Sequence, residues 1–374
     1  MEIAWFTDTW LPNRDGVVTS LLLFKKILEK KGHNIYIFAP GNENEREEEI
    51  FYYASKPFSK YPNYRITPVR TIFSARTKKL IKEISPDVIH SHSPGIIGLN
   101  AVIPSYKFRI PLIFTYHTFL NDSLYLIFKG RRIQHIGEKL LYIWLRWYFR
   151  RCSCIITPSN YVANEIKKFF DGDIKVLPNG IEIDFFEKGN GEKIRRKYEG
   201  KKIILHVGRI VREKNIDLLI KSAPLVLKKY DTIFIIVGEG PARRELEEKV
   251  KGCGLKDYFI FTGFVSDEEL ADYYKSADVF VFPSTYETQG IVAFEAMSAG
   301  LPVVGAKAKA IPEFIKDGVN GYLSSPYDEK EFAEKIFMAL ENKGVGNRGK
   351  EFVKKYSIEK MADSLIKIYE EYAR

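Results

Sequence analysis

The sequence predicts an α/β protein with two Rossmann-like domains, each a parallel sheet covered by helices. A chain of 374 residues is too long for one ordinary hydrophobic core and suggests two domains. A rhythm of strand followed by helix begins near residue 2 and begins again near residue 201. The stretch at about 180–200 is polar and rich in turn residues, which is typical of a domain junction.

Each predicted element follows from local periodicity. Short apolar runs rich in β-branched and aromatic residues indicate buried strands, and apolar residues at spacings of three and four indicate amphipathic helices. The elements predicted in this way are strands at 2–8, 34–40, 201–208 and 232–238 and helices at 17–31 and about 215–229.

The domain boundaries follow from these two series. We place an N-terminal domain at residues 1–190 and a C-terminal domain at 191–354. The last helix, at about 357–373, has apolar residues at helical spacing, and we expect the segment 355–374 to pack back onto the first domain. Because open parallel sheets bind ligands at the carboxyl ends of their strands, we expect the ligand site in the cleft between the two domains.

Composition excludes several classes of protein. The apolar content of 45% is normal for a globular chain, and no run of 18 apolar residues predicts a transmembrane helix. The first residues, MEIAWFTDTW, begin like a strand and lack the basic start of a secretory signal. Three cysteines, Cys152, Cys154 and Cys253, cannot form a disulfide framework, and C-x-C without a second ligand pair is poor evidence for a metal site. We therefore expect buried thiols in a reducing cytoplasm.

Residues 279–304 hold two glutamates, Glu287 and Glu295, around a predicted strand-to-helix turn. The helix opens near Gly290, where free backbone N–H groups and the positive end of the helix dipole favour phosphate oxygens. Carboxylates before and inside this helix start could bind hydroxyl groups on either side of the phosphates, as in a nucleotide sugar. The alternative is that these glutamates only stabilise the start of the helix, because glutamates near helix starts are common caps.

Three further loops follow predicted strands of the second domain. HVGRIVREKN (206–215) carries two cations suited to a diphosphate, Arg209 and Lys214. VGEGP (237–241) and FTGFV (261–265) are glycine turns where backbone groups could approach a flat base. Taken singly, such cations are more often solvated surface charges and such glycines plain turns. Four loops in order, each following a strand, form a stronger signal.

These loops make the chain similar to the retaining GT-B glycosyltransferases of family 4. The resemblance rests on HVGRIVREKN, VGEGP, FTGFV and ETQGIVAFEAMSAGLPVV, in that order. FTDTWLPNRDGVVTSL, TYHT and PNGIEIDFF in the first half of the chain also match the family. The resemblance covers nearly the whole chain and implies a GT-B fold and a hexosyltransferase.

The resemblance also implies roles for particular residues. Glu295 would hold the ribose hydroxyls, Glu287 the donor sugar, and Arg209 with Lys214 the diphosphate. Gly16 would let a loop of the first domain approach the phosphates. The other implied donor-binding residues are Gly238, Gly263, Phe264, Val265, Gln289, Gly290 and Ile291.

His117, in TYHT, would face the transferred sugar from the first domain. The alternative is a histidine satisfied at a strand end. The implied catalytic residues are His117, Arg209, Lys214 and Glu287. Arg209, Lys214 and the helix dipole could stabilise the departing diphosphate without a metal, and no D-x-D motif in a metal-binding context is found. We therefore expect no metal and no cofactor, with a nucleotide sugar as the donor substrate.

One departure from the family pattern narrows the expected acceptor. Many members carry an aromatic residue before Gly290, whereas this chain has Gln289. That variant, with the FTDTWLP and TYHT segments, looks most like the diacylglycerol glucosyltransferases. These enzymes transfer glucose from UDP-glucose to a lipid hydroxyl at a membrane surface. Few residues separate this subgroup from relatives that transfer mannose and from other relatives that transfer glucose.

The distribution of charge favours a lipid surface. Residues 51–151 contain 17 Lys and Arg against 4 Asp and Glu, a net of +13, whereas the whole chain carries +10. Residues 131–151 have helical periodicity, with Ile133, Ile136, Leu140, Trp144 and Trp147 on one face. Aromatic and aliphatic residues flanked by basic ones suit a helix in an anionic lipid interface. The expected acceptor or membrane residues are Arg131, Arg132, Lys139, Trp144, Arg146, Trp147 and Arg150.

An apolar stripe is more often a core face, and this helix must pack on its own sheet. Residues 119–128 are a possible second membrane contact. We expect a cytoplasmic enzyme bound peripherally to the inner face of the cell membrane. No nucleic-acid-binding motif is found, so we expect no nucleic-acid partner.

Other functions remain open. The runner-up is a soluble glycosyltransferase with a UDP- or GDP-sugar donor and a small polar acceptor. A sugar-nucleotide epimerase and a nucleotide-sugar binding protein without turnover fit the sequence less well.

Overall fold

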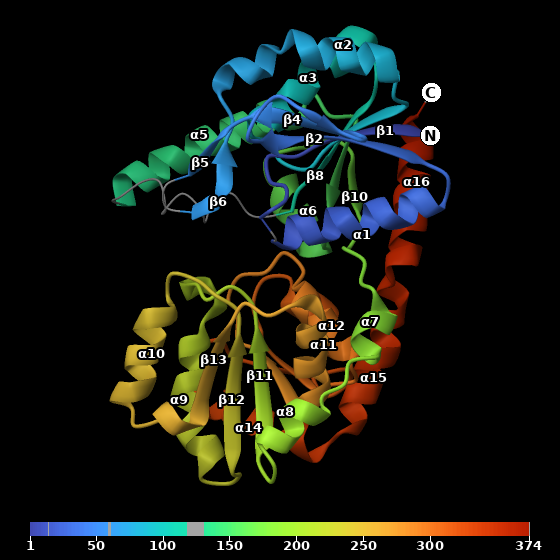
Figure 1. Ribbon diagram of the computed structural model, residues 1–374. Helices are drawn as coiled ribbons and strands as arrows, with labels where there is room; N and C mark the ends of the chain where they lie inside the picture. The colour runs from blue at the N-terminus through green and yellow to red at the C-terminus, as the bar shows by residue number, and fades with distance from the viewer. Residues whose placement is uncertain (14, 59–60, 118–130, 374) are drawn as a thin grey trace. The chain divides into compact units, whose positions relative to one another are not determined.

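The computed structural model describes residues 1–13, 15–58, 61–117 and 131–373 (Figure 1). The described chain divides into two compact units. Unit 1 comprises Met1–Gly180 and Ile358–Arg374, and unit 2 comprises Ile181–Ser357. The first boundary thus lies after Gly180, earlier than the expected residue 190, and the last helix groups with the N-terminal half of the chain.

Within its described residues, unit 1 contains an eight-stranded sheet in the order β10-β9-β8-β7-β1-β2-β4-β3. All neighbouring strands are parallel except β3, which pairs antiparallel with β4. A separate hairpin is formed by β5 and β6. The strands are β1 (Glu2–Phe6), β2 (Asn34–Gly41), β3 (Arg46–Glu47), β4 (Ile50–Ala54), β5 (Lys56–Phe58), β6 (Tyr61–Ile66), β7 (Val88–Ser91), β8 (Leu112–Thr115), β9 (Cys154–Thr157) and β10 (Ile174–Val176).

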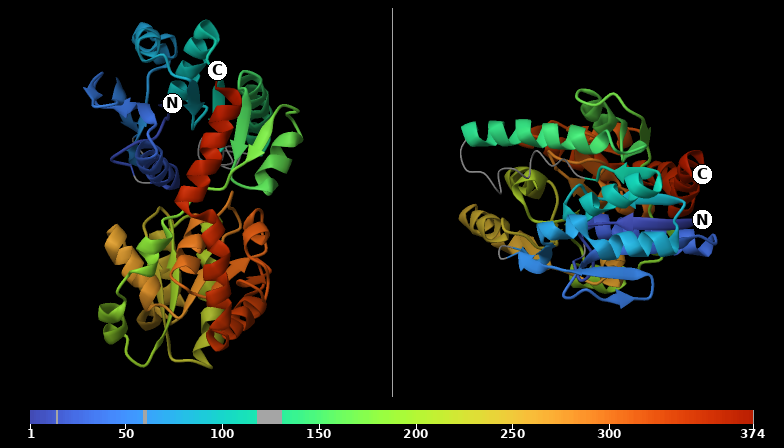
Figure 2. Two further views of the ribbon diagram at one scale, coloured as in Figure 1. Left: turned by 90° about the vertical axis from the view of Figure 1, so that its right-hand side faces the viewer. Right: turned by 90° about the horizontal axis from the view of Figure 1, so that it is seen from above.

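Helices cover both faces of this sheet (Figures 1 and 2). The helices of unit 1 are α1 (Gly16–Lys30), η1 (Val69–Phe73), α2 (Ala75–Ile84), α3 (Ile96–Phe108), α5 (Arg131–Phe149), α6 (Asn160–Lys167) and α16 (Ile358–Tyr372). One face of the sheet packs against α2, α3, α5 and α6. On the other face, Trp5 of β1 donates a hydrogen bond to the hydroxyl of Tyr369 in α16 at 3.1 Å, and both side chains are buried. This bond ties the last helix to the first strand.

The sheet of unit 2 is entirely parallel. Within the described residues it has six strands in the order β13-β12-β11-β14-β15-β16. They are β11 (Lys202–Val207), β12 (Thr232–Val237), β13 (Phe259–Gly263), β14 (Val279–Phe282), β15 (Val303–Ala306) and β16 (Tyr322–Ser324). These strands are almost wholly buried, as apolar parallel strands covered on both faces must be.

The helices of unit 2 complete a doubly wound fold. They are α7 (Ile183–Glu187), α8 (Glu192–Lys197), η3 (Arg212–Lys214), α9 (Ile216–Leu227), α10 (Arg243–Gly252), η4 (Lys256–Tyr258), α11 (Asp267–Ser276), α12 (Ile291–Ser298), α13 (Ile311–Phe314), α14 (Glu329–Glu341), α15 (Gly344–Val353) and η5 (Lys354–Tyr356). One sheet face packs against α9, α10 and α14. On the other face, Tyr274 of α11 contacts the rings of Phe186 in α7 and Phe280 in β14.

The predicted fold class of two Rossmann-like α/β domains with parallel sheets is confirmed. Of the six elements predicted first, each is found within two residues of its expected ends. The order of strands places the loops that follow β13, β12, β11 and β14 side by side at one edge of the unit 2 sheet. These are the loops whose residues the sequence singled out.

Candidate functional site

The turn between β14 and α12 depends on Gly290. This residue has φ of 91°, in the left-handed region that favours glycine. A Cβ atom at this position would lie 2.6 Å from a ring carbon of Phe282, so any side chain would collide with the strand. Helix α12 then begins at Ile291 with no hydrogen bond from a capping side chain. Its first N–H groups and the positive end of its dipole are therefore open to an anion.

The strand-end loops of unit 2 are hydrogen-bonded to one another. Gly208 donates to the carbonyl of Val237 at 3.0 Å, and Gly238 donates to the carbonyl of Gly263 at 2.9 Å. A Cβ atom on Gly238 would lie 2.1 Å from the carbonyl oxygen of Gly208, so this close approach requires glycine. Beyond Gly263, Phe264 is 77% exposed. The three glycine-containing loops thus form one continuous edge of backbone.

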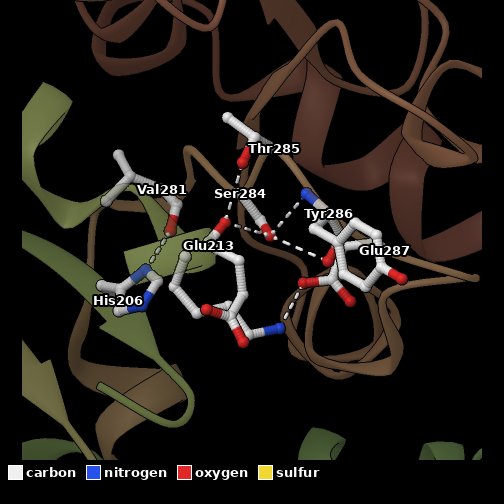
Figure 3. A network of polar contacts seen from close by, with 8 residues as sticks. His206, Glu213, Val281, Ser284, Thr285, Tyr286 and Glu287 are labelled. Atoms are coloured by element: carbon white, nitrogen blue, oxygen red, sulfur yellow. Dashed lines mark hydrogen bonds and ion pairs between the residues drawn. The ribbon is translucent and has the colours of Figure 1, made fainter. Parts of the chain in front are cut away.

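The β11 and β14 loops meet at Glu213. Its backbone carbonyl accepts hydrogen bonds from the Thr285 N–H at 3.0 Å and from the Ser284 hydroxyl at 3.3 Å (Figure 3). Beside this contact, Lys214 forms an ion pair with Glu287. Both side chains of the pair are largely buried, at 17% and 12% exposed. The structure therefore brings together two residues to which the sequence assigned different parts of the donor.

Arg209 presents an exposed guanidinium on the same loop as Lys214. Among the residues that the structure describes, no ion pair or side-chain hydrogen bond involves it. The exposed Arg209 and the uncapped start of α12 are positive features at the carboxyl edge of one sheet, and Lys214, which is paired with Glu287, belongs to the same edge. This edge of unit 2 is suited to bind an anionic ligand such as a diphosphate.

His206, at the end of β11, lies beneath these loops and is fully buried (Figure 3). Its Nδ1 lies 3.0 Å from the carbonyl oxygen of Val281, so Nδ1 carries the proton and donates. Burial, with a smaller effect of the nearby Lys214 ammonium and against the hydrogen bond to Val281, lowers the pKa of His206 to about 4. The imidazole is therefore neutral at physiological pH, and its Nε2 has no hydrogen-bond partner among the described residues.

Glu295 lies one turn inside α12 and is partly buried. Burial raises the pKa of its carboxyl to about 7 and Asp267 adds to this, whereas a hydrogen bond from Tyr274 acts in the opposite direction. The Tyr274 hydroxyl is 2.6 Å from Glu295 Oε2. A carboxylate that titrates near neutrality beside an anion-binding edge is typical of a functional site.

In unit 1, His117 follows β8 and belongs to a cluster of three histidines. Its Nε2 lies 3.2 Å from Nδ1 of His92. His90 lies between the hydroxyls of Tyr369 and Thr115, each at 2.7 Å. Burial lowers the pKa of His117 to about 4, so this side chain is neutral at physiological pH.

A cavity of about 20 Å³ adjoins this cluster, and its lining includes His92, His117, Ser20 and Asn179. The buried Nε2 of His92 has no hydrogen-bond partner among the described residues. A cavity of this size can hold roughly one water molecule.

The loop before α1 is organised by Asp15. Its Oδ1 accepts the N–H groups of Val17 and Val18 at 2.9 and 3.0 Å and so caps the helix. Its Oδ2 accepts hydrogen bonds from three further side chains, those of Thr9, Asn13 and Tyr64. A Cβ atom on Gly16 would meet nothing within 4 Å. Among the residues that the structure describes, the space beside Gly16 is therefore open and no neighbouring group requires glycine there.

Helix α5 packs one face on the core of unit 1 and exposes another. The inward face is formed by Leu141, Trp144, Leu145, Tyr148 and Phe149. Leu140 and Trp147, which the sequence placed on one stripe with Trp144, are instead 61% and 39% exposed. The stripe expected from periodicity is therefore divided between the core and the surface, because the helix turns a neighbouring set of residues inward.

The exposed face of α5 combines apolar and basic side chains. Ile143 is 66% exposed, and Lys139, Arg146 and Arg150 are also exposed. The Arg151 guanidinium lies 3.7 Å from the centre of the Trp147 ring. Arg131 and Arg132 begin the helix, but their side chains and the segment 119–128 lie outside the described residues. In the described part of the chain, no helix is both long enough and apolar enough to cross a membrane.

The remaining predicted positions can be placed as well. Gln289 is buried and Ile291 and Val265 are partly buried, all near the carboxyl edge of the unit 2 sheet. His117 and Gly16 belong to unit 1, whereas the other predicted donor-binding residues belong to unit 2. Among the described residues, no group of three or more His, Cys, Asp or Glu is arranged to hold a metal ion. Metal independence stays a prediction.

Sequence reasoning missed several partners of these residues. It did not single out Asp15, His92 or Tyr274, although HSH at 90–92 alternates as a strand end does and would place His90 and His92 on one face. For Tyr274 no local signal exists, because its contact with Glu295 joins two helices 21 residues apart in sequence.

Comparison with known proteins agrees with this geometry. Residues 14–185 match the family described as Glycosyltransferase Family 4, and residues 188–360 match Glycosyl transferases group 1. The chain is 32% identical to an alpha-monoglucosyldiacylglycerol synthase of Streptococcus pneumoniae over 353 residues, which cover 91% of this chain and 78% of that relative. It is 29% identical to a GDP-mannose-dependent alpha-mannosyltransferase of Corynebacterium glutamicum, over 88% of this chain and 78% of that one.

Among solved structures, HepE of Anabaena in complex with UDP-glucose superposes with a TM-score of 0.77 at 20% identity, over 99% of this chain and 100% of that chain. The fold and the relatives together define a glycosyltransferase of the GT-B fold. The chain belongs to the glycosyltransferases with family 4 and group 1 domains. The predicted family and enzyme class are confirmed.

Proposed function

We propose that this glycosyltransferase transfers a hexose, with glucose from UDP-glucose as the first choice, to the hydroxyl group of a membrane lipid such as diacylglycerol. The observation that carries the lipid acceptor is the exposed face of α5, where apolar side chains stand among arginines on a helix already anchored to its core. The 32% identity to an alpha-monoglucosyldiacylglycerol synthase supports the same acceptor class.

The donor would bind along the carboxyl edge of the unit 2 sheet. Its diphosphate would lie against the uncapped start of α12, with Arg209 and Lys214 supplying positive charge. The carboxylate of Glu295 would accept hydrogen bonds from the ribose hydroxyls. The edge formed by Gly208, Gly238 and Gly263 carries no side chains at these three positions, so a base could approach its backbone closely.

Donor binding would exchange partners at the ion pair. In the free protein Lys214 neutralises Glu287. A diphosphate carries more negative charge than one carboxylate and would compete for the ammonium group. Glu287 would then accept hydrogen bonds from the sugar hydroxyls, so that the same two side chains orient both halves of the donor.

The transfer would proceed through charge separation at the anomeric carbon. As the C–O bond to the diphosphate breaks, negative charge grows on the leaving oxygen and positive charge grows on the sugar ring. Arg209, Lys214 and the α12 dipole would stabilise the negative charge that grows on the leaving group. A diphosphate oxygen would accept the proton of the acceptor hydroxyl, and the anomeric configuration would be retained. No metal is required in this scheme.

His117 would contact the transferred sugar as a neutral imidazole. Its lowered pKa means that it does not carry a positive charge beside a developing oxocarbenium ion. A neutral ring can donate or accept one hydrogen bond to a sugar hydroxyl without opposing the charge that forms on the ring carbon. This is consistent with a role in positioning the sugar.

The lipid contact has an estimable strength. Leu140 and Ile143 are 61% and 66% exposed, and inserting each into an apolar interface would gain roughly 1–2 kcal/mol. Each basic residue near an anionic surface adds roughly 1 kcal/mol. A few such contacts give reversible binding, as expected of a peripheral enzyme at the inner face of the cell membrane.

The second candidate is a glycosyltransferase that uses a GDP-sugar and a small polar acceptor. The similarity to a GDP-mannose-dependent alpha-mannosyltransferase, at nearly the same identity as the lipid enzyme, favours it. The glycine edge that would face the base contains few side chains to discriminate uracil from guanine.

The test measures UDP release from UDP-glucose with anionic liposomes that contain or lack diacylglycerol, followed by mass analysis of the lipid. We expect release that depends on diacylglycerol and a lipid heavier by one hexose. Arg146→Glu should weaken liposome binding and lipid-dependent release, whereas Lys79→Glu, an equal charge change on exposed α2, should not. UDP release without lipid would contradict the lipid assignment. Release of nucleotide from GDP-mannose alone, and not from UDP-glucose, would contradict the donor assignment.

A further inference from the structure

Tyr274 lies where two helices of unit 2 face each other. It belongs to α11, its side chain is fully buried, and its ring contacts Phe186 and Phe280 at centroid distances of 5.5 and 5.6 Å. These contacts fix the ring, so the position of the hydroxyl group is set by the packing of α11 on the sheet. The hydroxyl group reaches α12, the helix that carries Glu295.

Two acceptors lie within reach of this single hydroxyl proton. Glu295 Oε2 is 2.6 Å away and the carbonyl oxygen of Val292 is 3.3 Å away. A short O–H···O contact to an ionised oxygen is the stronger of the two, so Tyr274 donates to the carboxylate. In the described part of the chain, Oε1 of Glu295 makes no hydrogen bond. One oxygen of the carboxylate is thus held while the other remains open.

We infer that Tyr274 is a positioning residue for donor recognition: its hydroxyl group holds Glu295 Oε2 so that the carboxylate presents a fixed orientation to the ribose hydroxyls. This inference rests on the proposed role of Glu295 in the donor site. A glutamate has three rotatable side-chain bonds, and a ligand that must order them loses part of its binding energy. Fixing one oxygen in advance removes that loss.

The protonation states agree with this arrangement. Burial raises the pKa of Tyr274 well above its ordinary value, so the phenol keeps its proton and remains a donor. The same hydrogen bond lowers the pKa of Glu295 against the upward effects of burial and of the charged Asp267, which also belongs to α11. Loss of the hydroxyl group should therefore leave Glu295 protonated to a higher pH.

A purely structural hydroxyl, one that only joins α11 to α12, would behave differently. Its loss would weaken binding of every nucleotide alike, whether or not the ribose carries hydroxyl groups. A positioning role predicts a loss confined to nucleotides with ribose hydroxyls. This difference allows a direct test.

The probes are UDP and GDP, and calorimetry compares the affinity of each with that of its 2′,3′-dideoxy counterpart. The variants are then tested with whichever nucleotide, UDP or GDP, the wild-type protein binds more tightly, and with its dideoxy counterpart. For the wild-type protein we expect the ribose hydroxyls to strengthen binding on the order of a hundredfold, because two hydrogen bonds to a charged group are lost together. Tyr274→Phe should weaken binding of the hydroxylated nucleotide roughly tenfold and leave the dideoxy nucleotide unchanged.

Two variants serve as controls. Tyr322→Phe removes the hydroxyl group of another buried tyrosine of unit 2, which accepts a 3.4 Å contact from Asn342, and should alter neither affinity. Glu295→Gln should abolish most of the preference for ribose hydroxyls. In Tyr274→Phe, the pH at which that preference is half lost should also move upward relative to the wild-type protein.

The outcomes separate the inference from the function it rests on. If the wild-type protein binds hydroxylated and dideoxy nucleotides equally, the ribose role of Glu295 is wrong and the inference fails with it. If the wild-type protein discriminates and Tyr274→Phe discriminates equally well, Glu295 keeps its role and only the positioning role of Tyr274 is overturned. Equal weakening of both nucleotides in Tyr274→Phe would assign the hydroxyl a structural role and overturn the inference as well.

Discussion

Replacing Glu295 by glutamine should reveal how one carboxyl group couples folding to nucleotide binding. Burial raises its pKa to about 7 from an ordinary value of 4.5. Between these two pH values the folded protein holds a proton at this site that the unfolded chain releases. Glutamine keeps the size and most of the hydrogen-bonding capacity of the side chain but cannot ionise.

The expected effect on binding follows from the fraction of Glu295 that is ionised. With a pKa of about 7, roughly 9% of the carboxyl groups are ionised at pH 6 and roughly 91% at pH 8. If only the carboxylate accepts both ribose hydroxyls, nucleotide affinity should rise roughly tenfold over this range. The terminal phosphate of the ligand also titrates near pH 6. The titration of this phosphate affects binding to the wild-type protein and to the glutamine variant equally. The ratio of the wild-type affinity to the variant affinity therefore reports the ionisation of Glu295 alone.

The effect on stability has the opposite sense. Because the folded state binds more protons than the unfolded state between pH 4.5 and 7, wild-type stability falls as the pH rises through this window. The change from pH 5 to pH 8 amounts to roughly 2–3 kcal/mol. Glutamine cannot titrate and so removes this dependence on pH. The stability of the variant relative to the wild-type protein should therefore rise with increasing pH, which melting temperatures at pH 5 and pH 8 would show.

Glu248→Gln, at an exposed position on α10, is the control and should change neither property. A wild-type to Glu295→Gln affinity ratio that stays constant from pH 6 to pH 8, together with a constant difference in melting temperature, would refute the raised pKa. A ratio of one at every pH would instead refute the contact with the ribose.

Three further changes have defined outcomes. Gly290→Ala places a Cβ atom 2.6 Å from the Phe282 ring, on a residue whose φ is 91°. The substitution should lower the free energy of unfolding by about 2–3 kcal/mol, as measured by chemical denaturation. Unchanged stability would contradict the described turn. Arg209→Ala removes an exposed cation and should leave the melting temperature unchanged while lowering kcat roughly a hundredfold or more; unaltered turnover would remove its leaving-group role. The double substitution Leu140→Ser and Ile143→Ser changes two exposed side chains, so the protein should still fold. Its binding to anionic liposomes should weaken by roughly 2–4 kcal/mol. Unchanged sedimentation with liposomes would show that α5 is not the membrane anchor.

The charged and glycine residues at the carboxyl edge of the unit 2 sheet could be grouped from the sequence because each lies at the end of a strand or in the loop that follows it. In a parallel sheet the loops after neighbouring strands must meet at one edge, so Arg209, Gly238, Gly263 and Glu287 could be grouped once the strands were assigned. The sequence also predicted that a helix opens near Gly290, and in the structure α12 begins at Ile291 after Gly290 in the left-handed region.

Helix α5 shows where periodicity reaches its limit. The spacing of its apolar residues identified a helix and an apolar stripe, and α5 indeed runs from Arg131 to Phe149. It did not identify which residues face the core, because this helix is apolar around much of its circumference. Packing on the sheet turned Leu145 and Tyr148 inward and left Leu140 and Ile143 in solvent. Only the neighbouring elements could decide this orientation.

The sequence by itself determined the α/β class, the two series of strands and helices, and the chemical character of each strand-end loop, because these depend on residues close together in the chain. The tertiary structure alone decided which distant side chains are partners. The Lys214–Glu287 ion pair joins residues 73 positions apart, and the histidine contact between His92 and His117 spans 25. Such contacts arise when strands far apart in sequence are placed side by side in a sheet, and no local pattern records which neighbour each strand will have.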